Sequence, residues 1–268
     1  MINPKPTCTR RPWGLLATVA LAALLPSILS PPIADAQQCY EVRSYIIGEH
    51  DRTIVENYIE RAMIPALNRQ DFYQIGALTT HASDQTGTTR VVLVIPIDDL
   101  SRWKLIDDKL KSDDNYQTAA KEYLDRQHDE PAMVRIQSEL LIAMDCMPEF
   151  EVDHESIDNS RRVYELRTYE SPNERLAQAK IDMFNNGEVP IFHASRITPI
   201  LIGRTLVGSQ MPSLTYLTVY PSDRQRTRAW EQFLANPDWK ELSAQPKYQN
   251  TVSRIDTYVL RPLLLSQM

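Results

Sequence analysis

The sequence predicts an α+β fold in which two βαββαβ units follow one another and close into one barrel, with helices outside. The stretch YEVRSYI, which begins at Tyr40, returns as YELRTYE at Tyr164. A repeat at such a spacing is typical of a duplicated structural unit. The apolar runs RVVLVI, from Arg90, and LTYLTVY, from Leu214, show little polar alternation, which indicates strands covered on both faces.

The first copy of the repeat heads a complete unit. After the strand YEVRSYI, the spacing of apolar residues predicts a helix, two strands, two helices and a closing strand. Their ranges are 51–69, 73–80, 90–95, 100–110, 116–127 and 134–143. We expect Pro96 to end the third strand, because proline cannot donate a hydrogen bond to a sheet.

The second copy heads the same order of elements. After YELRTYE, the predicted ranges are a helix at 173–186, strands at 199–207 and 214–220, a helix at 223–234, a shorter helix from 238 and a strand at 252–260. Landmarks recur at near-constant offsets, namely Pro65 and Pro190, Gly76 and Gly203, Pro96 and Pro221, Trp103 and Trp230, Arg135 and Arg254. The chain therefore contains two βαββαβ units.

One such unit covers one face of its sheet with helices and leaves the other face bare. Two units in one chain bury their bare faces against each other and need no second molecule. We predict a first domain at 38–146, a polar and acidic linker at 147–161 and a second domain at 162–265. The fourth strand of each unit should lie beside the first strand, antiparallel to it.

The first 36 residues have the pattern of a signal peptide. Arg10 and Arg11 supply the positive charge, residues 13–25 are apolar, and Ala34-Asp35-Ala36 places small residues at a cleavage site. Cleavage near Ala36 predicts export to the periplasm or beyond, with a mature chain that begins at Gln37. An uncleaved anchor and a twin-arginine signal are the alternatives. No later apolar run is long enough for a stable membrane span.

Composition limits the partners of the mature chain. Removal of residues 1–36 reduces 29 basic side chains to 26 and 35 acidic side chains to 34, which gives a net charge of −8. This balance argues against a nucleic acid partner, because nucleic acid binding requires basic patches. The mature chain keeps Cys39 and Cys146, which flank two strands expected to be neighbours, so we predict a disulfide between them. No Cys/His cluster indicates a metal site.

Several stretches carry a resemblance to a known family. They are YELRTYES from Tyr164, FNNGEVPIF from Phe184, IGRTLVGSQMPSLTYLTVY from Ile202 and AWEQFLANPDWKEL from Ala229. On these residues the C-terminal half resembles the NIPSNAP family of the dimeric α/β-barrel superfamily, and the N-terminal half resembles it more weakly. The resemblance implies a tandem of ferredoxin-like units that form one dimeric-type α/β barrel within the chain. It brings no catalytic motif.

Polar residues alternate along the first and fourth strands of both units. The candidate residues are Glu41, Arg43, Tyr45, Arg135, Glu139, Glu165, Arg167, Tyr169, Arg254, Asp256 and Tyr258. We expect their side chains to share the inner face of the barrel. One interpretation is a pocket whose arginines hold a carboxylate. The other is a network of paired charges that fixes strand register, because buried charges require partners with or without a ligand.

The chain lacks the motifs of common enzyme classes. It contains no Gly-x-Gly-x-x-Gly, no P-loop and no Gly-x-Ser-x-Gly. Some proteins of the wider superfamily bind haem through a histidine, and His193 is the candidate for that role; a surface or capping histidine is the alternative. The sequence predicts no cofactor. It favours an exported barrel that binds a small ligand or a protein partner, and leaves homo-oligomerisation open. The rival hypothesis is a cofactor-independent oxygenase or isomerase.

Overall fold

A computed structural model of the chain describes Met1, residues 37–152 and residues 159–268. The predicted signal peptide up to Ala36 and part of the predicted linker lie outside the described residues. The first half contains β1 (Cys39–Ile46), α1 (Arg52–Tyr58), η1 (Ile59–Met63), α2 (Ile64–Asn68), β2 (Gly76–Thr80), β3 (Arg90–Ile97), α3 (Leu100–Trp103), α4 (Ile106–Lys111), α5 (Asp114–Ala119), α6 (Lys121–Leu124) and β4 (Arg135–Ala143).

The second half repeats this order of elements. It contains β5 (Val163–Glu170), α8 (Glu174–Met183), η2 (Phe184–Glu188), α9 (Val189–Ala194), β6 (Thr198–Val207), β7 (Ser213–Tyr220), α10 (Asp223–Ala235), α11 (Pro237–Ala244), η3 (Pro246–Tyr248) and β8 (Arg254–Pro262). Side chains cap the major helices as their sequences suggest. For example, Asn173 accepts a hydrogen bond from the backbone of Leu176 at the start of α8.

The eight strands form one closed barrel in the order β1-β3-β2-β8-β5-β7-β6-β4. Within each half the fourth strand lies antiparallel beside the first, as expected. The two halves join at two seams, where β2 pairs with β8 and β4 pairs with β6. The α+β fold and the closure of the barrel within a single chain are therefore confirmed.

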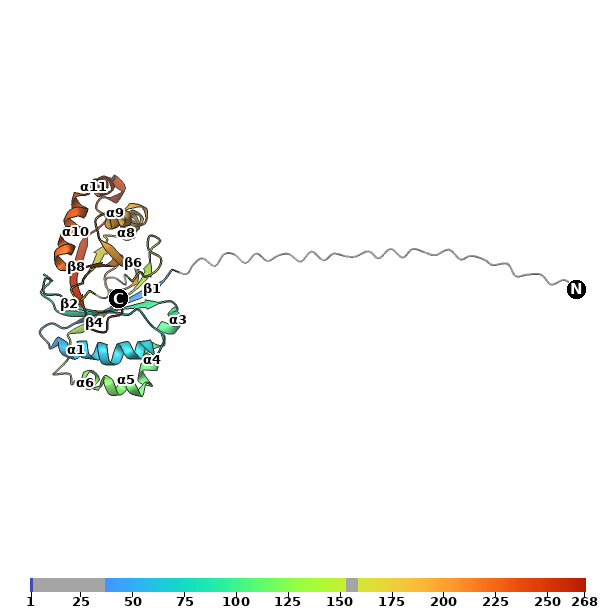
Figure 1. Cartoon of the computed structure of the whole chain (residues 1–268), viewed down its shortest axis with the longest axis vertical. Coiled ribbons are helices and arrows are strands. Elements are labelled where there is room, and N and C mark those ends of the chain that lie inside the picture. Colours follow the sequence, from blue (N-terminus) through green and yellow to red (C-terminus); the bar gives the residue numbers. More distant parts are fainter. Residues whose placement is uncertain (2–36, 153–158) are drawn as a thin grey trace. The chain divides into compact units, whose positions relative to one another are not determined.

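The helices lie outside the barrel on two opposite sides. Figure 1 shows α1, α4, α5 and α6 on one side of the strands and α8 to α11 on the other. Each helical layer buries one apolar cluster against its own half of the barrel, while a third cluster fills the lumen. The lumen cluster includes Val42, Val92, Leu166 and Leu217. The barrel is thus a packed core rather than an open chamber.

A proline interrupts the first long helical segment in each half at a corresponding place. The π-helical turns η1 and η2 immediately precede α2 and α9, which hold Pro65 and Pro190 in their first turns. Proline lacks an amide hydrogen and clashes with the carbonyl group four residues earlier, so a regular α-helical turn does not accommodate it. The wider π-turn lets the helix continue. The helix predicted at 173–186 consequently extends to Ala194.

Pro96 does not end its strand, in contrast to the prediction. β3 continues to Ile97, and Pro96 lies opposite Tyr40 of β1. The pairing of β3 with β2 on its other side ends at Val94. Pro96 is therefore at an edge of the sheet on that side, where a missing amide hydrogen costs no hydrogen bond between strands.

The predicted disulfide is absent: Cys39 and Cys146 are both free thiols. Cys39 is buried in the apolar cluster beneath the helices of the first half. Cys146 follows β4 by three residues and packs against the cluster of the second half, where its backbone amide donates to Asn185. The error arose because the chain turns toward the other half as soon as β4 ends.

Within the parts of the chain that the structure describes, no helix combines the length and apolar character needed to span a bilayer.

Candidate functional site at the mouth of the barrel

Strand register separates the eleven candidate residues into two groups, which corrects the prediction that all of them point inward. In β1 and β4, Glu41, Arg43 and Tyr45 lie opposite Leu140, Ser138 and Ile136. Glu139 lies opposite Val42, a residue of the lumen cluster. If all the candidate residues shared one face, Glu41 would lie opposite a candidate residue of β4. The observed register is shifted from this by one residue, and such a shift moves every side chain of a strand to the other face.

The same separation holds between β5 and β8. Glu165, Arg167 and Tyr169 face the helices, whereas Tyr258 lies opposite Leu166 of the lumen cluster. The outer group is therefore Glu41, Arg43, Tyr45, Glu165, Arg167 and Tyr169. The inner group is Arg135, Glu139, Arg254, Asp256 and Tyr258.

Glu41 is the centre of the outer network in the first half. Its carboxylate is 1% exposed and accepts hydrogen bonds from Arg43 Nε at 2.7 Å, Trp103 Nε1 at 2.7 Å and Ser138 Oγ at 2.7 Å. Burial alone would raise the pKa of Glu41, but the charge of Arg43 and these three donors lower it below its usual value. Both oxygens of this carboxylate accept hydrogen bonds from the protein itself.

Glu165 has the corresponding place in the second half. Its carboxylate is fully buried and accepts hydrogen bonds from Arg167 and from Arg226 of α10. The Arg167 guanidinium lies over the Trp230 ring, 3.7 Å from its centre. Both outer groups are thus networks of paired charges that join the sheet to its helices.

The inner group lies at the barrel end where β3, β4, β7 and β8 begin, which we call the mouth. A cavity of about 30 Å³ lies there. Its polar lining comes from Ser44, Arg90, Gln137, Glu139, Thr168, Gln210, Thr215 and Tyr258. A cavity of this size holds roughly one water molecule or the tip of a ligand. The apolar lumen lies directly behind it.

Arg90 is the unusual residue of the mouth. Its side chain is 7% exposed, its Nε has no hydrogen-bond partner, and no carboxylate among the described residues forms an ion pair with it. The guanidinium stacks on the Tyr258 ring, 3.5 Å from the ring centre. Burial lowers the pKa of Arg90, and Tyr258, Asp84 and Asp256 raise it in part; an arginine side chain stays protonated in proteins. A buried cation without a carboxylate partner is costly, so Arg90 is a candidate to hold an anion.

Glu139 lies in the same cavity and also has no cationic partner in the described chain. Burial raises its pKa, a hydrogen bond from Thr215 lowers it, and the charge of Asp256 raises it, with a net increase. A raised carboxyl pKa favours the neutral acid, which can donate a hydrogen bond. At a pH below this raised pKa, Glu139 is the neutral acid, and its hydroxyl group can donate a hydrogen bond.

The other inner residues have partners or face water. Asp256 accepts from Arg254 at 2.9 Å and from Gln210 at 2.7 Å, so its charge is compensated. Arg135 is exposed at the start of β4. His193 lies in the last turn of α9 and is also exposed. No group of three metal-ligating side chains occurs in the described ranges.

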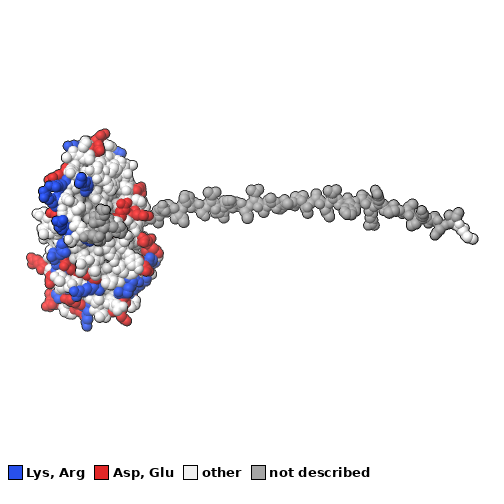
Figure 2. Space-filling model, viewed as in Figure 1, with Lys and Arg blue, Asp and Glu red and all other residues white. Residues whose placement is uncertain are grey.

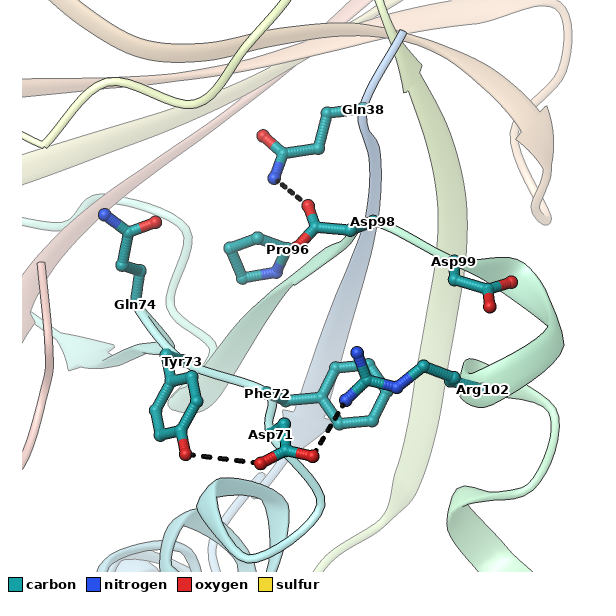
Figure 3. A pocket seen from close by; sticks show the side chains of 9 residues that line it. All are labelled: Gln38, Asp71, Phe72, Tyr73, Gln74, Pro96, Asp98, Asp99 and Arg102. Carbon is teal, nitrogen blue, oxygen red and sulfur yellow. Dashed lines mark hydrogen bonds and ion pairs between the residues drawn. The ribbon is translucent and has the colours of Figure 1, made fainter. Parts of the chain in front are cut away.

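Two surface grooves are alternative candidate sites. In the first of them, the charged side chains already have partners within the protein. A groove of about 190 Å³ lies beside α3 in the first half. Figure 3 shows Gln38 reaching Asp98, and Arg102 reaching Asp71 while it lies against Phe72. Asp99 caps α3 by accepting from the backbone of Ser101. Each charge in this groove has a partner.

The second groove, of about 310 Å³, lies beside α10 and is lined by Arg196, Gln225 and Arg228 among others. Figure 2 shows basic side chains along the side of the molecule on which Figure 1 places α10. Both arginines are exposed, so water solvates them and no ligand is required. Unlike these two grooves, the mouth combines a cavity with a buried cation that has no ion-pair partner among the described residues.

Arg90 is not among the residues expected from the sequence, because the run RVVLVI as a whole has the pattern of an apolar strand. Arg90 alternates with Val92 and Val94, which belong to the lumen cluster. A single basic residue at the head of an otherwise apolar strand, in phase with its inward-facing valines, was the signal that could have found it.

Comparisons with known proteins support the fold, and the second half is similar to one known family. A crystal structure named "Putative monooxygenase" from Fusobacterium nucleatum is similar over 85% of this chain and 93% of its own, with 12% identity and a TM-score of 0.55. A structure named "putative monooxygenase" from Lactobacillus acidophilus is similar over 84% and 94%, with 14% identity and a TM-score of 0.54.

An "anthrone oxidase-like protein" is similar over 84% of this chain and 91% of its own, with 8% identity and a TM-score of 0.51. At these identities the likeness establishes the dimeric α/β-barrel fold and nothing about activity. No curated protein matches the chain. The sequence model of the NIPSNAP family matches residues 164–267. This match covers YELRTYES and the other stretches quoted for the second half, so residues 164–267 are similar to the NIPSNAP family.

Proposed function

We propose that this protein is an exported binding module whose barrel mouth holds the anionic group of a small ligand. The observation that carries the proposal is Arg90, a buried cation with an unused Nε–H at a cavity. Removing one partner of a buried ion pair lowers the stability of a protein by about 3–5 kcal/mol, because the other charge stays buried without a partner. Asp84 and Asp256 act on this guanidinium without forming an ion pair with it, so a ligand anion in direct contact with Arg90 adds a counter-charge at short range.

The filled lumen favours binding over catalysis in the barrel. An oxygenase or isomerase acting on a small organic molecule needs an enclosed site that surrounds most of its substrate, with a volume of roughly 300–1,000 Å³. The cavity at the mouth is about 30 Å³, and apolar side chains occupy the space behind it. The names of the similar structures describe those proteins only. The cavity at the mouth of this protein supports a site that binds one group of a ligand.

Anion binding at Arg90 is tested by nuclear magnetic resonance of the arginine Nε–H groups. Titration with sodium chloride, phosphate and acetate should move the Arg90 signal to saturation with at least one of these anions. Arg90→Gln should abolish saturable binding, whereas Arg196→Gln, which removes an exposed charge on the opposite half, should not. An Arg90 signal that none of the three anions moves would reject the mouth as an anion site.

Export is tested separately from binding. Expression of the full chain with its own first 36 residues should release a protein whose N-terminal residue is Gln37. The reason is the charged, apolar and small-residue order that precedes this position. N-terminal sequencing of the exported fraction measures it. Protein that retains Met1, or that starts inside β1, would contradict cleavage after Ala36.

A further inference from the structure

We propose that two copies of the chain associate through the free edge of β4, which pairs with itself, antiparallel, about a twofold axis at Gln137. In this arrangement Arg135 of each copy lies opposite Glu139 of the other copy. The partner is a second copy of this chain because the edge is complementary in charge to itself. The inference concerns assembly and is independent of anion binding at Arg90.

The edge of β4 is free because its two neighbouring strands cover different lengths of it. β1 pairs with β4 from Arg135 to Ile142, whereas β6 pairs with it only from Leu140 to Ala143. On the β6 side, residues 135–139 therefore have no strand beside them, and no backbone group of a described loop bonds to them there. The residues from Arg135 to Ser138 are exposed. A strand edge of this kind is a template for pairing with another strand.

Backbone alternation shows which groups point to the open side. The amide of Ala143 donates to the chain just before β1, and the amide of Met144 donates to Ile202 of β6. Hydrogen bonds to one neighbour involve every second residue of an antiparallel strand, and the register of β4 against β1 has no shift. The amide and carbonyl groups of Ile136 and Ser138 therefore point away from β1, to the open side.

The free backbone groups and the charges select the same register. Pairing about Gln137, the middle of the free edge, joins Ile136 of one copy to Ser138 of the other. It also places Arg135 opposite Glu139 on the same face of the sheet. Directly opposite residues have Cβ atoms about 4.5–5.5 Å apart, and opposite charges at such positions stabilise the pairing. Neither Arg135 nor Glu139 forms an ion pair with a described residue, so each supplies the charge that the other lacks.

The equivalent edge of β8 lacks this complementarity. β2 pairs with β8 only near its end, but the loop after β2 covers more of the edge. There the amide of His81 donates to Val259, and the side chain of Asp84 accepts from it. Pairing β8 with itself about Asp256 would place two aspartates opposite each other, which is unfavourable. Arg254 already forms an ion pair with Asp256 of its own strand.

Apolar side chains at the free edge are also exposed. Ile136 is 45% exposed, and Val207, where the pairing of β6 with β4 stops, is 64% exposed. A second strand along the edge covers part of this surface, which favours association. Because each copy uses the same edge, the twofold pairing is closed and stops at two copies.

Analytical ultracentrifugation of the full protein over a concentration series measures the association, and a reversible dimer is expected. Arg135→Glu and Glu139→Arg each place like charges opposite one another at two positions. Either variant should raise the dissociation constant of the dimer at least about tenfold. An equimolar mixture of the two variants should associate again, because opposite charges then face each other. The double variant Arg135→Glu/Glu139→Arg should associate on its own for the same reason.

Ile136→Pro tests the strand edge itself. Proline removes an amide hydrogen that points to the open side and leaves the hydrogen bonds between β1 and β4 in place, so the dimer should be lost. Ile255→Pro, at the equivalent position of β8, should leave the dimer intact. Circular dichroism checks that each variant is folded. Hydrogen exchange of the parent is a second measurement: the amides of Ile136 and Ser138 should become protected as concentration rises, and that of Thr257 should not.

Three results would overturn the inference. The first is a protein that stays a monomer at every concentration, which leaves a strand of a different protein as the alternative partner of the edge. The second is a dimer whose dissociation constant the two charge reversals do not change. The third is a dimer that Ile255→Pro breaks and Ile136→Pro does not. None of these results bears on anion binding, which the titration of the Arg90 signal tests separately.

Discussion

Replacing both Arg167 and Arg226 with alanine should lower the free energy of unfolding by about 3–5 kcal/mol at neutral pH. The two arginines are the cations that pair with the fully buried carboxylate of Glu165. Without them the carboxylate stays out of contact with water and has no counter-charge. Each single replacement should cost less, because one arginine remains. Urea denaturation followed by circular dichroism measures the difference.

The controls for this prediction lie on the same helix and at the same carboxylate. Arg224→Ala removes an exposed arginine of α10 and should change the free energy of unfolding very little. Adding Glu165→Gln to the double variant should recover part of the loss, because it removes the unpaired charge while it keeps the shape. A double variant as stable as the parent would show that the outer network does not stabilise the fold.

The second large effect is expected from Lys180→Met. Lys180 Nζ lies 2.7 Å from Glu188 Oε2, and both side chains are buried beneath the helices of the second half. Methionine keeps the apolar stem but leaves Glu188 without its nearest counter-charge. Loss of one partner of a buried pair costs about 3–5 kcal/mol. The exposed Lys240→Ala should cost almost nothing in comparison.

The loss caused by Lys180→Met should depend on pH. Burial raises the pKa of Glu188, and Lys180 and Arg167 lower it in part. A carboxyl group whose pKa is higher in the folded state binds its proton more tightly there, so it loses stability as pH rises from the unfolded pKa through the folded pKa. Lys180→Met should therefore be least damaging in acid. Denaturation curves at several pH values measure this slope, and a loss that is equal at all pH values would contradict it.

The fold could be predicted from the sequence because the repeat is a strong signal with one physical solution. YEVRSYI and YELRTYE head two units that each leave a sheet face bare, and mutual burial of these faces closes the barrel. The pairing of the first with the fourth strand followed from the same unit. The structure confirms both features.

The candidate site could be predicted only in part, because alternation gives the period of a strand and not its phase against a neighbour. Glu41 and Glu139 both lie in alternating polar stretches, and the residues alone do not show that they face opposite sides of the sheet. The register fixes this, and it depends on contacts between distant segments. Cys146 shows the same limit: its position just past β4 did not reveal which half its side chain would contact.

Closure of the barrel within one chain removes a constraint that two separate, identical subunits would impose. About a twofold axis, every side chain at the mouth would occur twice. Strand register shows which residues of the two halves occupy equivalent positions. Arg90 is equivalent to Ser213, because their neighbours Ile46 and Glu170 correspond in the repeat. Glu139 is equivalent to Tyr258, because their neighbours Val42 and Leu166 correspond. A symmetric assembly would carry arginine at both positions or at neither. Because the two units lie in one chain, one half can carry arginine and glutamate where the other carries serine and tyrosine.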